Sequence, residues 1–232
     1  IMASPGGLPH PTITDDTALG GAVIERSLRF RGSSSTKMTR TFGTNTSNTT
    51  KTISFWMKRG RLGATGGMQN LFCTALSGYI EGRLRINTDD TLQLEDRDAS
   101  GGTSDGRRQT SAKLRDVLAW YHIVMALDST QDTELDRAKF YINGEQVTAY
   151  DSTRDIAQNY SFSFLRSGVD NFIGCMSGSS EFFDGYLADI HFIDGAALDA
   201  SHFGYTEPQT GIWRPKKFKK SNIPNSTTTT YS

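Results

Sequence analysis

The chain has 232 residues, with 25 Lys and Arg against 25 Asp and Glu, so its formal net charge is zero. Zero net charge argues against a general nucleic-acid binder, a class that usually carries a basic excess. No run of about 18 apolar residues is present to cross a membrane. The opening IMASPGGLPHP lacks the apolar segment of a secretory signal, and the sequence does not explain why Ile1 precedes Met2.

Residues 1–26 are rich in Pro, Gly and Thr and have no apolar periodicity, which indicates an extended N-terminal arm. Period-two patterns follow. In TISFWMK (52–58), Ile53, Phe55 and Met57 share one face, which we expect to be the core, and Trp56 lies on the opposite face.

The same alternation recurs in later segments. The residues expected to face the core are Leu84, Ile86, Leu92 and Leu94, then Tyr121, Ile123, Met125 and Leu127, then Phe140 and Ile142, and finally Tyr186, Ala188, Ile190 and Phe192. Asn143-Gly144 supplies the positive-φ pair of a tight hairpin. Helix should be scarce, with one turn near Leu198–Phe203. We therefore predict an all-β, antiparallel two-sheet sandwich over 27–213.

The chain ends in a tail over 214–232 that is first basic and then polar. Its basic residues are Arg214, Lys216, Lys217, Lys219 and Lys220. Two interpretations stay open for them: a solvated tail, or assembly contacts that clamp an acidic neighbour in a salt-sensitive way. The two cysteines, Cys73 and Cys175, lie in apolar strand-like contexts, and we expect buried, inert thiols.

The order of the segments is more specific than their composition. SLRF is followed by TISFWMKRG, then by WYHIVMALD running into KFYINGEQV, then by FIG and FFDGYLADIHFIDGAAL. This succession resembles the laminin-G-like domains of the concanavalin-A-like lectin/glucanase superfamily, which implies a jelly-roll sandwich. The continuation FIDGAALDASHFGYTEPQTGIWRPKKF is similar to a variant found in structural proteins of marine tailed bacteriophages and large viruses. In such relatives these residues are architectural: Gly185 allows two backbones to approach, and Trp120 helps to fill the sandwich.

Catalytic patterns are missing. The glucanases of the superfamily carry Glu-x-Asp-x-(x-)Glu on one strand, a spacing that sets a nucleophile beside an acid. The nearest candidates, LEDRD (94–98), TELD (133–136) and EFFDG (181–185), lack it, and we expect solvated carboxylates. No two histidines have the spacing of metal ligands, and we expect each to be a sheet-face residue. The chain is therefore expected not to be an enzyme.

No cofactor is expected, and a bound calcium ion is the open alternative. Asp89 with Asp90, or Asp128 with Asp132, could contribute ligands, although turn-capping aspartates explain the same residues more simply.

Carbohydrate recognition would need an exposed aromatic side chain beside polar groups. The candidates are Trp56, Tyr141 and Trp213, together with the loop 177–183. An aromatic residue in a sandwich is more often part of a core.

The resemblance leads to three functional hypotheses. The first is a non-enzymatic virion protein of a tailed phage, a capsid decoration or tail appendage, assembled in the host cytoplasm and docked through its termini. Its partners would be other virion proteins and further copies of itself, with neither nucleic acid nor membrane insertion. The second is an adhesion module that binds host-surface glycans, and the third is a polysaccharide depolymerase. The position on the particle, the symmetry and the identity of a glycan stay open.

Overall fold

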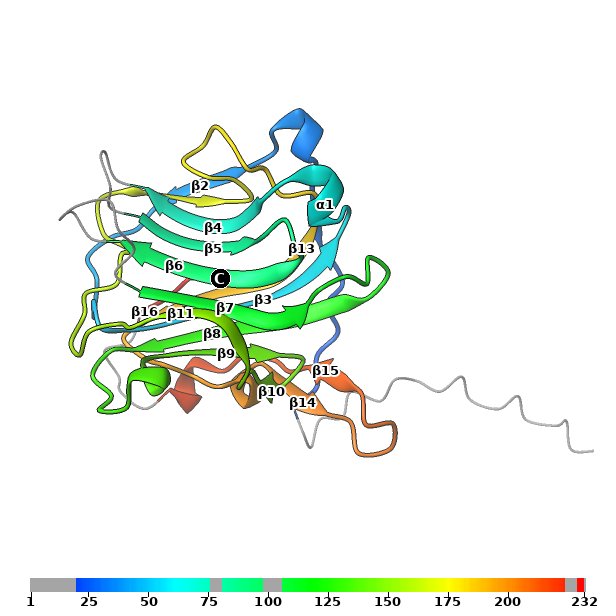
Figure 1. The fold of residues 1–232 in the computed structure, drawn as a ribbon. Coiled ribbons are helices and arrows are strands. Elements are labelled where there is room, and N and C mark those ends of the chain that lie inside the picture. The colour runs from blue at the N-terminus through cyan, green and yellow to red at the C-terminus, as the bar shows by residue number, and fades with distance from the viewer. Residues whose placement is uncertain (1–19, 76–80, 98–105, 224–228, 232) are drawn as a thin grey trace, which may run out of the picture.

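Figure 1 shows the computed structural model, which describes residues 20–75, 81–97, 106–223 and 229–231. Two large sheets pack against each other around one main hydrophobic core. Within the described residues, every ladder between two strands is antiparallel. The predicted all-β sandwich is confirmed.

The first sheet has the strand order β1 (Leu28–Phe30), β13 (Gly185–Asp194), β3 (Thr50–Arg59), β8 (Trp120–Asp128), β9 (Ala138–Ile142) and β10 (Glu145–Gln146), with β16 (Thr229–Tyr231) also paired to β13. The second sheet has the order β11 (Tyr150–Arg154), β7 (Gly106–Lys113), β6 (Thr91–Arg97), β5 (Glu81–Ile86), β4 (Gln69–Ala75), β12 (Asp170–Ile173) and β2 (Met38–Thr41). A small third sheet joins β14 (Gly204–Thr206) to β15 (Trp213–Pro215).

Helical structure is confined to single turns in the described residues. These are η1 (Gly32–Ser34), α1 (Gly63–Gly66), η2 (Glu134–Arg137), η3 (Ala200–His202) and η4 (Lys220–Asn222). The turn predicted near Leu198–Phe203 is η3. None of the helices described is long or apolar enough to cross a membrane.

The main core follows the predicted alternation over most of its length. Ile53, Phe55 and Met57 of β3 are fully buried between the sheets. Side chains from both sheets meet them, namely Leu84, Ile86, Leu92, Leu94, Ile123, Met125, Leu127 and Phe140. The two thiols are buried and free, as expected. Burial also raises the pKa of Cys175.

Strand β13 departs from strict alternation. Its register against β3 shifts after Ala188, and Asp189 has a positive φ of 47°. Leu187, before the shift, and Phe192, after it, both point into the main core. The prediction that Tyr186 and Ala188 face the core is therefore wrong, because a bulge adds a residue and reverses the faces on one side of it.

The outer face of the first sheet is covered by the chain that follows β13. In Figure 1 this segment, in orange and red with β14 and β15, lies beneath β8 and β9. With Val124 of β8 and Ile193 of β13, it forms a second cluster of buried side chains, to which it contributes Ala196, Leu198, Ala200, Phe203 and Ile223. Burial of a side chain such as Phe203 contributes about 1.5–3 kcal/mol. The described part of the predicted tail, 214–223, takes part through Phe218 and Ile223.

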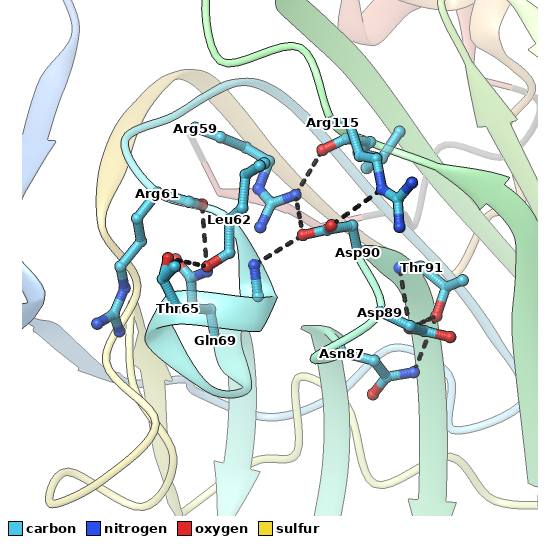
Figure 2. A network of polar contacts seen from close by, with 12 residues as sticks. Arg59, Arg61, Leu62, Thr65, Gln69, Asn87, Asp89, Asp90, Thr91 and Arg115 are labelled. Carbon is cyan, nitrogen blue, oxygen red and sulfur yellow. Dashed lines mark hydrogen bonds and ion pairs between the residues drawn. The ribbon is translucent and has the colours of Figure 1, made fainter.

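A buried ion pair joins the two sheets at one end of the sandwich (Figure 2). Asp90, in the turn between β5 and β6, accepts hydrogen bonds from Nη1 of Arg59 on β3 at 2.8 Å and from Nε of Arg115 at 3.2 Å. The backbone N–H of Gly63 donates to the same carboxylate at 2.7 Å. Burial alone would raise the pKa of Asp90, but the hydrogen bond from Gly63 and the guanidinium of Arg59 hold it below its usual value.

The aspartates considered as calcium ligands are engaged in local hydrogen bonds. Asp89 accepts from the backbone N–H of Thr91 at 3.2 Å and from its hydroxyl at 2.7 Å. Asp128 accepts from the hydroxyl of Thr130 at 2.6 Å, and Asp132 accepts from a glutamine amide. The turn-capping interpretation accounts for these contacts. In the described ranges, no three His, Cys, Asp or Glu side chains gather as a metal site.

The expectation of solvated carboxylates is wrong for Glu95 and Asp96 of LEDRD, whereas Asp98 lies outside the described residues. Glu95 and Asp96 lie on β6 in the middle of the second sheet and are buried. Asp96 accepts a hydrogen bond from the hydroxyl of Tyr160 at 2.8 Å, and Glu95 is surrounded by arginines. The other candidate carboxylates are partly exposed. Three of them form ion pairs: Glu134 with Arg108, Asp136 with Lys139, and Asp184 with Arg29.

Candidate functional site

All three tryptophans line one groove on the outer face of the first sheet. Its volume is about 430 Å³. It is lined by the N-terminal segment 21–27 and by β15 with Tyr205 and Glu207. We call this feature the tryptophan groove; its aromatic side chains are Trp56, Trp120, Tyr205 and Trp213. A volume of this size fits a small ligand, because such pockets usually measure about 300–1,000 Å³.

Trp213 is held in place by close packing. A Cβ atom added to Gly144 would lie 2.4 Å from the Trp213 ring, and one added to Gly204 would lie 2.3 Å from it. Gly144 also has a φ of +88° in the hairpin predicted from Asn143-Gly144. Two glycines therefore provide the space in which the indole lies.

A buried histidine lies beneath two of the indoles. Nε1 of Trp213 donates to Nδ1 of His122 at 3.0 Å, and Nε2 of His122 lies 3.0 Å from Oγ of Ser54. Because Nδ1 accepts the indole proton, the hydrogen of the neutral ring is on Nε2. Burial lowers the pKa of His122 to about 4, so the ring is neutral at physiological pH. The His122 ring also packs against Trp56, with ring centroids 4.9 Å apart.

Trp56 offers an unused hydrogen-bond donor. Its side chain lines the groove and is only 8% exposed. Its indole Nε1 is buried and has no hydrogen-bond partner among the described residues. An unpaired buried donor of this kind costs about 1–3 kcal/mol.

Trp120 does not fill the sandwich, contrary to the expectation. It is the first residue of β8, where Tyr121 packs on the main core and Trp120 therefore points outward. It is 37% exposed, and its ring centroid lies 6.4 Å from that of Tyr186. An exposed indole in a groove presents a large flat surface for contact with a ligand.

Charged groups stand along the rim of the groove. Arg214 pairs with Glu207 at 3.2 Å, and Glu25 and Arg26 are exposed on the N-terminal wall. A hydrogen bond from Thr210, followed by those from Arg214, lowers the pKa of Glu207. The groove thus combines aromatic side chains with carboxylate and guanidinium groups that can bind hydroxyls.

The structure brings together two of the three predicted aromatic candidates, Trp56 and Trp213, and the basic residue Arg214. Tyr141 packs instead on the second cluster, where burial raises its pKa. Sequence reasoning missed Trp120, although its position one residue before Tyr121 could have placed it on the outer face.

The remaining predicted basic residues lie outside the groove lining. The backbone of Lys216 bridges to Gly21, and its Nζ donates to the carbonyl of Ser201 at 3.0 Å. Lys217, Lys219 and Lys220 are exposed. In the candidate loop 177–183, the backbone carbonyl of Glu181 accepts from the N–H of Asn70 on the second sheet, at 2.8 Å.

Comparisons with known proteins agree with this architecture. No curated protein sequence matches the chain. Among solved structures, a native heptameric SAP-like pentraxin from Limulus polyphemus is 18% identical over 75% of this chain and 77% of its own, with a TM-score of 0.50. A leech intramolecular trans-sialidase complexed with 2,7-anhydro-Neu5Ac is 16% identical over 72% of this chain and 26% of its own, with a TM-score of 0.50. NanB, determined with Optactamide, is 15% identical over 78% of this chain and 28% of its own, with a TM-score of 0.52.

Identities this low show a likeness of fold alone. The family comparison is more specific: a laminin G model, described as the concanavalin A-like lectin/glucanases superfamily, matches residues 31–201, which is more than half of the chain. The chain therefore belongs to the concanavalin A-like lectin/glucanase superfamily.

Proposed function

We propose that this chain is a non-catalytic carbohydrate-binding domain whose sugar site is the tryptophan groove. The observation that carries the proposal is the convergence of Trp56, Trp120 and Trp213 on one groove of about 430 Å³. A pyranose ring presents a face of C–H groups and an edge of hydroxyls. The exposed indole ring of Trp120 can stack on the C–H face, while the charged groups at the rim can bind the hydroxyls.

A non-catalytic role is proposed because the glucanase pattern is missing and the nearest carboxylates are engaged elsewhere. Glu95 is paired with arginines, and Asp96 accepts hydrogen bonds from Tyr160 and Ser163. We therefore expect binding without turnover.

The test is a glycan array followed by tryptophan-fluorescence titration of the full chain with the glycans that bind. Trp120→Ala should weaken the affinity at least about tenfold, because an exposed aromatic ring at the centre of a binding site carries much of the binding energy. Leu118→Ala is the matched control: Leu118 is 80% exposed and lies outside the groove lining, so its removal should leave the affinity unchanged. Equal loss in both variants, or release of shortened glycan products, would overturn the proposal.

For its setting, we propose a virion structural protein of a tailed phage, either a capsid decoration or a tail appendage. The supporting observation is the signature FIDGAALDASHFGYTEPQTGIWRPKKF. Its residues build the second cluster and one wall of the tryptophan groove. In this arrangement the termini dock on neighbouring virion proteins, or on further copies of the chain, and the sandwich faces outward.

Particle incorporation tests the setting. Lys217, Lys219 and Lys220 are exposed, so changing all three to Glu should prevent salt-sensitive docking on an acidic neighbour without unfolding the domain. The readout is the copy number of the variant in purified particles. Lys58→Glu with Lys113→Glu is a control for charge reversal away from the tail. Normal incorporation of the triple variant would contradict docking through the basic run.

A further inference from the structure

Four arginines surround one buried carboxylate on the outer face of the second sheet. Arg83 and Arg85 of β5 lie 2.6 and 3.4 Å from Oε2 of Glu95. Arg97 of β6 and Arg107 of β7 lie 3.2 and 3.0 Å from its Oε1. We call these five residues the arginine cluster.

Strand register places the cluster on one face. Arg83, Glu95 and Arg107 are direct cross-strand partners on β5, β6 and β7. Their neighbours Leu84 and Leu94 point the other way, into the main core. Because successive side chains alternate across a sheet, the cluster lies on the face turned away from the first sheet and from the tryptophan groove.

The cluster holds more positive charge than its own carboxylate can balance. Four guanidiniums against one carboxylate leave three positive charges in excess. Glu181, another carboxylate whose charge acts on Arg85, accepts a hydrogen bond from the side-chain amide of Asn70, and counting it still leaves an excess of positive charge among the described residues. Like charges held this close in a partly buried site repel one another, so a stable arrangement favours a further anion.

Part of the cluster is open to solvent. The side chains of Arg97 and Arg107 are 26% and 34% exposed, whereas that of Glu95 is 2% exposed. The Nε atoms of Arg97 and Arg107 are buried and have no hydrogen-bond partner among the described residues. The carboxylate therefore forms the floor of the cluster, and guanidinium groups form its accessible rim.

We propose that the arginine cluster binds the acidic group, carboxylate or sulfate, of an acidic polysaccharide. Guanidinium groups bind both anions through paired N–H donors. Beside the cluster, Nε of Arg85 donates to Gln93 at 2.9 Å, and Gln93 donates to Gln109 at 3.3 Å. The partly exposed Gln109 extends the polar face toward sugar hydroxyls. The zero net charge of the chain disfavours an unselective attraction to every polyanion.

This site lies on the opposite sheet from the tryptophan groove and does not depend on it, so the two can be tested apart. The full chain is titrated at about 50 mM salt, where charge interactions are weakly screened. The probes are polygalacturonate for carboxylates, dextran sulfate for sulfates, neutral dextran, and single-stranded DNA as a polyanion that is not a glycan. Binding to one or both acidic glycans is expected, with neither neutral dextran nor DNA bound comparably.

The variant is Arg97→Gln with Arg107→Gln, in which Glu95 keeps Arg83 and Arg85 as partners. Affinity for the acidic glycan should fall at least about tenfold, since two charge-assisted contacts are lost. Arg40→Gln, at an exposed position on β2 of the same sheet, removes one positive charge away from the cluster and should change affinity less than about twofold.

Thermal unfolding checks that the double variant is folded, and Trp120→Ala should still bind the acidic glycan. Three results would overturn the proposal: no binding of either acidic polymer, the same loss with Arg40→Gln, or equal binding of DNA. None of these results bears on neutral-glycan binding at the tryptophan groove.

Discussion

Nε1 of Trp213 donates a hydrogen bond to Nδ1 of His122 at 3.0 Å, which ties the C-terminal segment to strand β8. The bond requires an unprotonated Nδ1, so it exists only while the imidazole is neutral. Because Trp213 forms one wall of the tryptophan groove, the protonation state of His122 is coupled to the shape of the proposed sugar site.

The stability of the domain should depend on the protonation of His122. Its folded-state pKa of about 4 lies below the ordinary value of 6.5, so between these values the unfolded chain binds a proton that the folded chain does not. Stability is therefore full above pH 6.5 and is lost as the pH falls toward 4. Between about pH 7 and pH 5 we expect a loss of about 2 kcal/mol in the free energy of unfolding.

Urea denaturation across this pH range measures the effect. His122→Gln, which cannot be protonated, should flatten the pH dependence, although the variant is less stable overall. His202→Gln, at a partly exposed histidine, is the matched control and should keep the wild-type slope. If His122→Gln keeps the wild-type dependence of the unfolding free energy on pH, that dependence arises from a group other than His122.

A methyl group at Gly204 should disturb the tryptophan groove. Its Cβ would lie 2.3 Å from the Trp213 ring, and no positive φ is involved, so the effect of Gly204→Ala is steric. We expect a loss of stability of about 1–3 kcal/mol together with weaker glycan binding. Gly43→Ala is the control, because a Cβ there meets nothing within 4 Å. Thermal unfolding measures the stability, and fluorescence titration measures the glycan affinity. If both variants have the same stability and affinity, the Trp213 side chain can shift to accommodate the added methyl group.

The sequence predicts the sandwich well where one face of a strand is apolar. Alternation alone predicts Ile53, Phe55 and Met57 in the core, and all three side chains lie there. The bulge at Asp189 could not be foreseen, because a single residue in a left-handed conformation leaves no mark on the pattern. It reversed the faces assigned to Tyr186 and Ala188.

The candidate site was harder to predict, since it depends on contacts between distant segments. Trp56 is predicted on the outer face, but its burial there, beside the N-terminal segment 21–27 and β15 in one groove, depends on contacts that its own strand does not show. The arginine cluster was missed because its members are ordinary surface residues until β5, β6 and β7 are set side by side. The register between strands is a tertiary property that local patterns do not contain.

Removal of the Asp90 carboxylate should be costly. Asp90→Ala leaves the fully buried Arg59 without its ionic partner, and we expect a loss of about 3–5 kcal/mol in the free energy of unfolding. The neighbouring Asp89→Ala removes the hydrogen bonds to Thr91 and a long one from Gln109, breaks no ion pair, and should cost about 1 kcal/mol. Urea denaturation of the two variants compares them directly. A loss at Asp89 as large as at Asp90 would assign the effect to the turn rather than to the ion pair.

Calcium should not stabilise this turn. The carboxylate of Asp90 already faces the guanidiniums of Arg59 and Arg115, and a further cation there would be repelled. The expected outcome is an unchanged melting temperature when calcium or a chelator is added to the purified chain. A rise with calcium that Asp90→Ala abolishes would show that the ion displaces the arginines.

Glu95 should make the domain sensitive to acid. Burial alone would raise its pKa, but the guanidinium of Arg83 and the other arginines lower it to about 2 from an ordinary 4.5. The stabilisation is therefore complete above pH 4.5 and is lost as the pH falls toward 2. Over that interval Glu95 should account for a loss of about 3 kcal/mol.

Glu95→Gln isolates this contribution, because glutamine keeps the shape and cannot ionise. At neutral pH the variant should be less stable by about 3–5 kcal/mol, since four arginines lose their common partner. The difference in unfolding free energy between wild type and variant should shrink as the pH approaches 2.5, where Glu95 is partly protonated. Glu145→Gln, at an exposed position on β10, should show no such convergence. A difference that stayed constant with pH would mean that Glu95 acts through its packing and not through its charge.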